Sequence, residues 1–218
     1  MPTPAGDARI TWHRAASASA SASASASGAR AVLAVSHGAG GGIEARDLRA
    51  LAAALPPLGV DVALVEQPWR VAGKKVAPAP KTLDTGWRAL WPALEKPGLP
   101  VVAGGRSAGA RVACRTAREL GASAVLALSF PLHPPGRPER SRAEELLDAG
   151  LPTLVVQGDR DPFGRPEEFP ELPVGMELVG IPHGDHGFAV PKRADIGQEE
   201  ALALITGAVA DWLARLPG

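Results

Sequence analysis

The chain has 218 residues, which is enough for one domain with a buried core and too few for two domains of ordinary size. Its 23 lysine and arginine residues equal its 23 aspartate and glutamate residues, so no overall charge draws it to nucleic acid or to an anionic membrane. We therefore expect neither partner, and any ligand must be recognised by a local site.

The sequence favours a soluble cytoplasmic protein. No stretch approaches the roughly 20 apolar residues of a membrane-spanning helix. The first residues, MPTPAGDARITWHR, lack the charged start and apolar run of a secretory signal. The single cysteine, Cys114, can form no internal disulfide, which fits a reducing compartment, and we expect it in the core.

Residues 1–29 are expected to contain an N-terminal strand followed by a flexible segment. Residues 15–28 read AASASASASASASG, and neither alanine nor serine is a good strand former or offers much surface to bury. We interpret this repeat as a flexible linker, with the long turn of an N-terminal hairpin as one form of it. Residues 30–218 are expected to form a single domain.

Short apolar runs alternate with amphipathic segments after residue 30. The runs are continuous rather than alternating, as in strands that are covered on both faces of a sheet. The expected strands are residues 31–36, 60–66, 100–104, 124–129, 152–158 and 176–181. The expected helices are residues 43–55, 83–94, 107–120, 142–150 and 198–216. This alternation predicts an α/β fold with a mostly parallel central sheet and helices on both faces.

Ligands of such sheets bind beyond the carboxyl ends of the strands. The residues that follow four of the runs are SHGAGGG, GGRSAG, QGDRDPFG and PHGDHGF. A histidine-glycine loop, a serine between glycines, an acid and a second histidine are therefore expected at one edge of the sheet.

Ser107 stands in the pattern G-x-S-x-G, with Gly105 before it and Gly109 after it. In a nucleophile elbow the serine occupies a strained turn from strand to helix, and the glycines remove side chains that would collide. The turn raises the hydroxyl above the sheet at the positive end of the helix. We predict that Ser107 is a nucleophile.

A serine hydroxyl needs a base to take its proton and an acid to orient that base. His186 is the predicted base, with His183 as the alternative in HGDHGF. Asp161 is the predicted acid, with Asp159 as the alternative in GDRDPFG. The chain order of serine, acid and histidine is the order of α/β-hydrolases.

Donors for an oxyanion are expected from two places. The backbone N–H of Ala108 follows the nucleophile at the helix start. The loop HGAGG supplies the second donor, which is the N–H of Ala39 or that of Gly40.

Further side chains near the predicted strand ends are candidates for contacting a substrate. Each has an ordinary alternative: a surface salt bridge for Arg106, a loop position for His133, and packing for the aromatic residues. The candidates are His37, Trp69, Arg106, His133, Phe163 and Phe188.

Two other kinds of site are less well supported. His183 and His186 with Asp185 between them have a metal-like spacing, but zinc sites need a third and usually a fourth ligand. The loop GAGGGI resembles a dinucleotide fingerprint, with Glu66 as the ribose-binding acid, yet Ile43 replaces its third glycine. We expect no metal and no cofactor.

Six motifs together resemble a known family, the small α/β-hydrolases that include dienelactone-hydrolase-like bacterial proteins and similar eukaryotic proteins. The motifs are SHGAGGG, EQPWR, GGRSAGARVA, SFPLHPPGRPE, VQGDRDPFG and GDHGF, within residues 30–215. The resemblance implies Ser107 as nucleophile, Asp161 as acid and His186 as base. Dienelactone hydrolases themselves use a cysteine nucleophile, so the serine argues against their particular lactone chemistry.

Only about twenty residues separate the fourth apolar run from the fifth, where many lipases insert a cap, so we expect no large cap domain and an open cleft. The predicted function is hydrolysis of a small ester, thioester or lactone through an acyl-Ser107 intermediate. The alternative is a non-catalytic protein-interaction module of the same fold.

Overall fold

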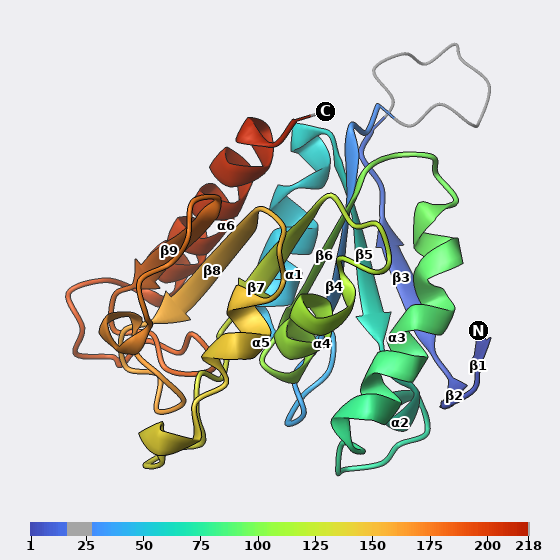
Figure 1. The fold of residues 1–218 in the computed structure, drawn as a ribbon. Coiled ribbons are helices and arrows are strands. Elements are labelled where there is room, and N and C mark those ends of the chain that lie inside the picture. Colours follow the sequence, from blue (N-terminus) through green and yellow to red (C-terminus); the bar gives the residue numbers. More distant parts are fainter. Residues whose placement is uncertain (17–27, 218) are drawn as a thin grey trace.

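The computed structural model describes residues 1–16 and 28–217, which form a seven-stranded sheet between two layers of helices (Figure 1). The strand order is β3-β5-β4-β6-β7-β8-β9, and all neighbours are parallel except β3 and β5. The strands are β3 (Arg9–His13), β4 (Ala31–Ser36), β5 (Val60–Glu66), β6 (Val101–Arg106), β7 (Ala124–Leu128), β8 (Thr153–Gly158) and β9 (Met176–Ile181). All six predicted strands are confirmed.

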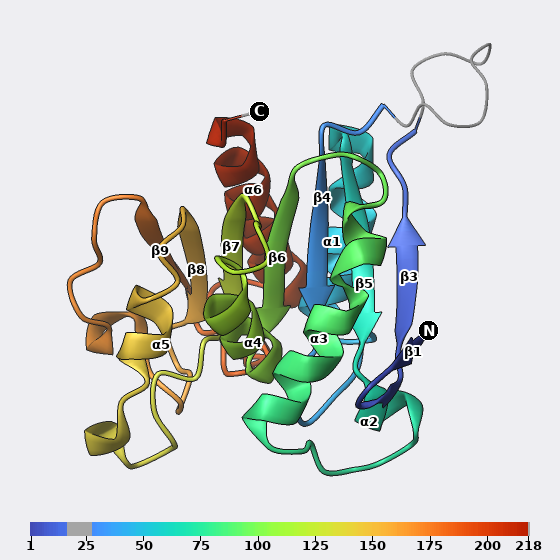
Figure 2. The same cartoon turned by 45° about the vertical axis from the view of Figure 1, so that its right-hand side comes forward.

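Helices cover both faces of the sheet, as predicted. One layer holds α1 (Arg46–Ala54) and α6 (Gln198–Arg215), and the other holds α3 (Pro80–Glu95), α4 (Ala108–Thr116) and α5 (Ala143–Leu147) (Figure 2). Short elements complete the chain: β1 (Pro2–Thr3), β2 (Gly6–Asp7), α2 (Pro68–Val71), and 3₁₀ turns at Pro56–Leu58, Pro138–Arg140 and Pro166–Glu168. Within the described ranges, no helix has the length and hydropathy needed to cross a membrane.

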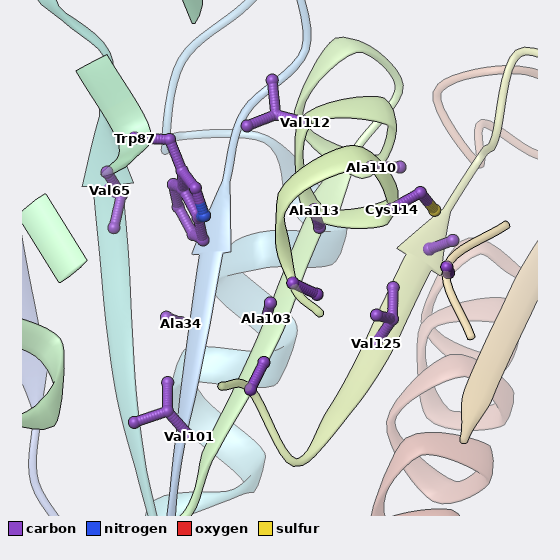
Figure 3. Packing of buried hydrophobic residues seen from close by; sticks show 14 of the residues in the cluster. Ala34, Val65, Trp87, Val101, Ala103, Ala110, Val112, Ala113, Cys114 and Val125 are labelled. Carbon is purple, nitrogen blue, oxygen red and sulfur yellow. The ribbon is translucent and has the colours of Figure 1, made fainter. Parts of the chain in front are cut away.

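The two cores follow from the alternation of side chains along each strand. In β4, Val32 and Ala34 pack on the α3/α4 side, whereas Leu33 and Val35 pack against α1 and α6. Small strand residues leave room for the large side chain of Trp87, which lies on α3 in the first of these cores (Figure 3). Continuous apolar runs are therefore needed in the central strands.

β9 differs from the expectation that every run is covered on both faces. It is the last strand of the sheet, and only Ile181 is buried, whereas Glu177 and Gly180 are exposed. The expectation is wrong for β9 because an edge strand lacks a neighbour on one side.

The N-terminal strand β3 is the other edge of the sheet. It pairs antiparallel with β5, with Trp12 opposite Ala63, and β5 separates it from β4. The hairpin interpretation is therefore wrong, because β3 and β4 are not neighbours.

Most of the alanine-serine repeat lies outside the described residues. Its start is held by Asp61, which accepts hydrogen bonds from Arg14 Nη1 at 2.6 Å and from the N–H of Ala15 at 2.8 Å.

We expect the thiol of Cys114 to be inert in the folded protein. Cys114 lies on α4 with its side chain in the core, the residue is 3% exposed, and burial raises the pKa of its thiol to about 12. Because the thiolate is the reactive form, Ellman's reagent at about pH 8 should label the native protein only slowly. The same protein in denaturant should react fully and at once, and rapid labelling without denaturant would contradict this packing.

Candidate active site

Ser107 lies in a strained turn between β6 and α4. Its backbone angles are φ 53° and ψ −109°, and a positive φ is rare for non-glycine residues. The Ser107 N–H donates to the carbonyl of Leu128 at 2.9 Å, which anchors the turn to the neighbouring strand β7. The turn places the serine at the carboxyl edge of the sheet and at the N-terminus of α4.

The glycines of the turn are required by close backbone contacts. A Cβ on Gly105 would lie 2.4 Å from the carbonyl carbon of Gly109. A Cβ on Gly109 would lie 2.6 Å from the carbonyl oxygen of Ser36, at the end of β4. The pattern G-x-S-x-G is therefore needed for the start of α4 to lie this close to two strand ends.

Three side chains form one hydrogen-bonded chain at this edge. His186 Nε2 lies 2.9 Å from Ser107 Oγ, and His186 Nδ1 lies 2.8 Å from Asp161 Oδ2. Because a carboxylate only accepts, Nδ1 is the donor to Asp161, and Nε2 is free to accept the serine proton. This is the order of contacts that a nucleophile, a base and an acid require.

The carboxylate of Asp161 is fully buried and held on both oxygens. Oδ1 accepts the N–H of Phe163 at 2.8 Å, and Oδ2 also accepts Nε2 of Gln157 at 2.9 Å. The sequence reasoning missed Gln157, although an amide within an otherwise apolar run was a signal.

The structure distinguishes between the two candidates for the acid and between the two candidates for the base. Asp161, rather than Asp159, contacts His186. His183 points elsewhere and pairs with the exposed carboxylate of Asp195 at 2.5 Å.

His37 does not lie where a substrate-contacting residue would. It is 1% exposed, its Nδ1 lies 2.9 Å from the carbonyl of Gly38, and its Nε2 accepts the N–H of Gln67 at 3.1 Å. Burial lowers the pKa of His37, so the ring stays neutral and ties the glycine loop to the start of α2. The predicted substrate contact is replaced by a structural one, because both ring nitrogens are engaged.

The loop that is predicted to supply one oxyanion donor begins beside Ser107. Gly38 packs against the elbow, since a Cβ there would lie 3.2 Å from Ser107 Cβ. Ala39 and Gly40 follow in the exposed part of the loop. Ala108 is the first residue of α4, where a backbone N–H has no partner within the helix. The assignment of donors stays a prediction.

The remaining aromatic and histidine candidates divide into two groups. Phe163 lies against the ring of His186, with 4.2 Å between the ring centroids. The other three are buried: Trp69 packs on His37, Phe188 is fully buried beneath α6, and His133 N–H donates to the carbonyl of Phe163 at 3.0 Å. These three were predicted to contact substrate, but their burial gives them packing and support roles instead.

Arg106 is mostly buried beneath the site. Its side chain is 14% exposed, Nη2 donates to the carbonyl of His186 at 2.6 Å, and Nε lies 3.4 Å from Asp47 Oδ2. The expected surface salt bridge is instead an ion pair with the buried Asp47, which the sequence reasoning did not single out, and a contact of Arg106 with substrate stays a prediction. In the part of the chain that the structure describes, no three histidine, cysteine or acidic residues are grouped as metal ligands.

A mostly parallel sheet with a strained serine turn after a central strand defines the α/β-hydrolase fold. The family model described as "Alpha/beta hydrolase domain" matches residues 29–214. The chain therefore belongs to this family, and the predicted fold without a large cap domain is confirmed.

Solved structures share the fold at low sequence identity. An α/β serine hydrolase without lid from Xanthomonas campestris is 20% identical with a TM-score of 0.74, covering 100% of this chain and 93% of its own. A dienelactone hydrolase from Anabaena variabilis is 18% identical with a TM-score of 0.69, covering 97% and 93%. Est1E from Butyrivibrio proteoclasticus, with ferulic acid bound, is 14% identical with a TM-score of 0.68, covering 95% and 96%. No curated protein matches the chain.

Gly109→Ala and Gly207→Ala should change stability in opposite directions. The Gly109 methyl group overlaps the backbone of Ser36, and we expect a loss of about 1–3 kcal/mol or more in the free energy of unfolding. Gly207 lies exposed within α6, where an added Cβ meets no described atom within 4 Å, so alanine should add about 0.5–1 kcal/mol. Urea unfolding measures both values, and an unchanged Gly109→Ala protein would contradict the close contact.

His37 should make the protein less stable as the pH falls. Its folded-state pKa lies below the ordinary value of 6.5, so below that pH the unfolded chain binds a proton that the folded chain does not. The stabilisation is fully present above about pH 6.5 and is lost at lower pH. We expect wild type to exceed His37→Asn in unfolding free energy near pH 7.5, and the difference to shrink near pH 5.5. A constant difference would contradict a neutral, buried ring.

Proposed function

We propose that the protein is a serine hydrolase that cleaves a small ester, thioester or lactone through an acyl-Ser107 intermediate. The observation that carries this proposal is the hydrogen-bonded chain from Ser107 through His186 to the buried Asp161. These hydrogen bonds are not explained by packing alone, because Ser107 is held in a strained backbone conformation to make them.

In the acylation step, Ser107 Oγ attacks the substrate carbonyl carbon while its proton passes to His186 Nε2. The N–H groups of Ala108 and of Ala39 or Gly40 stabilise the resulting oxyanion, each contributing about 3–4 kcal/mol in known cases. The intermediate collapses, the bond to the alcohol or thiol breaks, and His186 gives its proton to that leaving group. The acyl group then remains on Ser107.

In the deacylation step, His186 takes a proton from water, which attacks the acyl carbonyl. The second tetrahedral intermediate collapses, the bond to Ser107 Oγ breaks, and His186 returns the proton to that oxygen. Asp161 stabilises the imidazolium in both steps. Because Gln157 and Phe163 hold its carboxylate, Asp161 keeps the ring in the tautomer that accepts the serine proton.

A small substrate is proposed because the described residues place no cap domain over the site, and an open site offers little surface to bind a long acyl chain. Between β7 and β8 the chain forms only the turn Pro138–Arg140 and the helix α5, without a cap domain. Two of the similar structures are named as a dienelactone hydrolase and as Est1E with ferulic acid bound, which agrees with a substrate of modest size. Phe163, beside His186, is the side chain that would meet the acyl or alcohol group.

Replacing Ser107 should remove ester hydrolysis without unfolding the protein. We expect wild type to hydrolyse p-nitrophenyl acetate faster than p-nitrophenyl dodecanoate, and Ser107→Ala to lower the acetate rate by at least about 10³-fold. Ser123→Ala is the matched control, since Ser123 directly precedes β7 at the opposite edge of the sheet, and it should keep the wild-type rate. Equal rates for wild type and Ser107→Ala would favour the non-catalytic alternative.

A further inference from the structure

Arg106 occupies the last position of β6, directly before Ser107, and carries a charge that the proposed mechanism does not use. Nη2 donates to the backbone carbonyl of His186 at 2.6 Å, so one side of the guanidinium is engaged with the residue that must take the serine proton. Arg106 therefore links the strand that positions the nucleophile to the loop that positions the base.

The other side of the guanidinium faces a buried carboxylate. Nε of Arg106 lies 3.4 Å from Oδ2 of Asp47, whose side chain is 0% exposed in the first turn of α1. Burial raises the pKa of Asp47, and the charge of Arg106 opposes this rise. The charges of Arg106 and Asp47 therefore stabilise each other. Removing either side chain would leave the other charge buried without a partner, which is destabilising.

Two glycines leave the space that the guanidinium fills. A Cβ on Gly38 would lie 3.2 Å from Nη1 of Arg106, and a Cβ on Gly187 would lie 3.4 Å from Nη2. Gly38 belongs to the loop expected to supply an oxyanion donor, and Gly187 directly follows His186. The same guanidinium thus packs against the oxyanion loop, α1 and the histidine loop.

The histidine loop has a second support, the carboxylate of Asp185 within the loop itself. Oδ1 of Asp185 accepts the N–H of Gly187 at 2.7 Å and that of Ala189 at 2.8 Å, which closes a tight turn. The turn can therefore form without Arg106. Arg106 fixes the distance between this turn, which carries His186, and the turn at Ser107.

We propose that Arg106 is a positioning residue for His186, and that Asp47 holds Arg106 in the required orientation. The hydrogen bond to the His186 carbonyl sets how Nε2 approaches Ser107 Oγ. This inference rests on the proposed serine-hydrolase function and names no new contact with substrate. Misplacement of a catalytic group by about 1 Å costs about 10²-fold in rate, which sets the size of the expected effect.

The chain offers a matched control in Arg115 of α4. Its side chain is 20% exposed and pairs with Asp84 of α3, Nη2 to Oδ1 at 2.6 Å, so it resembles Arg106 in burial and in having a carboxylate partner. Arg115 also pairs with Glu145 of α5, and its hydrogen bonds and ion pairs within the described residues do not involve His186. Loss of Arg115 therefore tests what the loss of a part-buried ion pair does by itself.

The experiment measures kcat and KM for p-nitrophenyl acetate and the urea unfolding midpoint of wild type, Arg106→Ala, Arg106→Lys, Asp47→Asn and Arg115→Ala. Arg106→Ala should lower kcat by about 30–100-fold with little change in KM. Arg106→Lys keeps the charge without the planar fork, so it should recover only part of the rate. Asp47→Asn should lower kcat in the same direction, and Arg115→Ala should lower stability while keeping the wild-type kcat.

Added guanidinium ion separates positioning from general destabilisation. At concentrations far below those that unfold the protein, it should raise kcat of Arg106→Ala severalfold and leave Arg115→Ala unchanged. A wild-type kcat for Arg106→Ala would overturn this inference alone, as would equal kcat losses in the Arg106 and Arg115 variants without rescue. Absence of turnover by wild type would overturn the proposed function, and the inference with it.

Discussion

The positive φ of Ser107 is the constraint on which the rest of the site depends. It costs of order 1–3 kcal/mol, and it persists because surrounding contacts leave no alternative. The N–H of Ser107 is bound to Leu128, and Gly105 and Gly109 allow backbone contacts that any Cβ would break. This strained conformation places the Ser107 hydroxyl at the carboxyl edge of the sheet, within hydrogen-bond distance of His186.

Three loops surround this serine: the glycine loop, the loop that carries Asp161 and the loop that carries His186. One buried or mostly buried polar side chain holds each of them. His37 ties the glycine loop to Gln67, Gln157 fixes the carboxylate of Asp161, and Arg106 links the histidine loop to Asp47. Each of these groups would be costly to bury without its partner. Their pairing therefore gives each loop one position, which is the preorganisation that the proposed acyl transfer requires.

The sequence predicted most of the fold because short continuous apolar runs are typical of the strands of a mostly parallel sheet. The runs 31–36, 60–66 and 176–181 have the same bounds as β4, β5 and β9. The chain of Ser107, His186 and Asp161 was anticipated from strand ends and motif order, since all three follow strands that end at one edge. The partners of His37 and Arg106 were not anticipated from the sequence. A polar residue near a strand end has the same sequence pattern whether it faces solvent or a buried partner. Only the fold brings Asp47 beside Arg106 and exposes one side of β9.

Covalent labelling with a fluorophosphonate, followed by intact-mass and peptide mass spectrometry, tests most directly whether the hydrogen-bonded chain activates Ser107. A fluorophosphonate reacts with a serine whose proton can be taken by a neighbouring base. We expect one adduct per molecule on the peptide that contains Ser107, and much slower labelling of His186→Ala. A folded wild-type protein that forms no adduct, or that carries it on another residue, would contradict an activated Ser107.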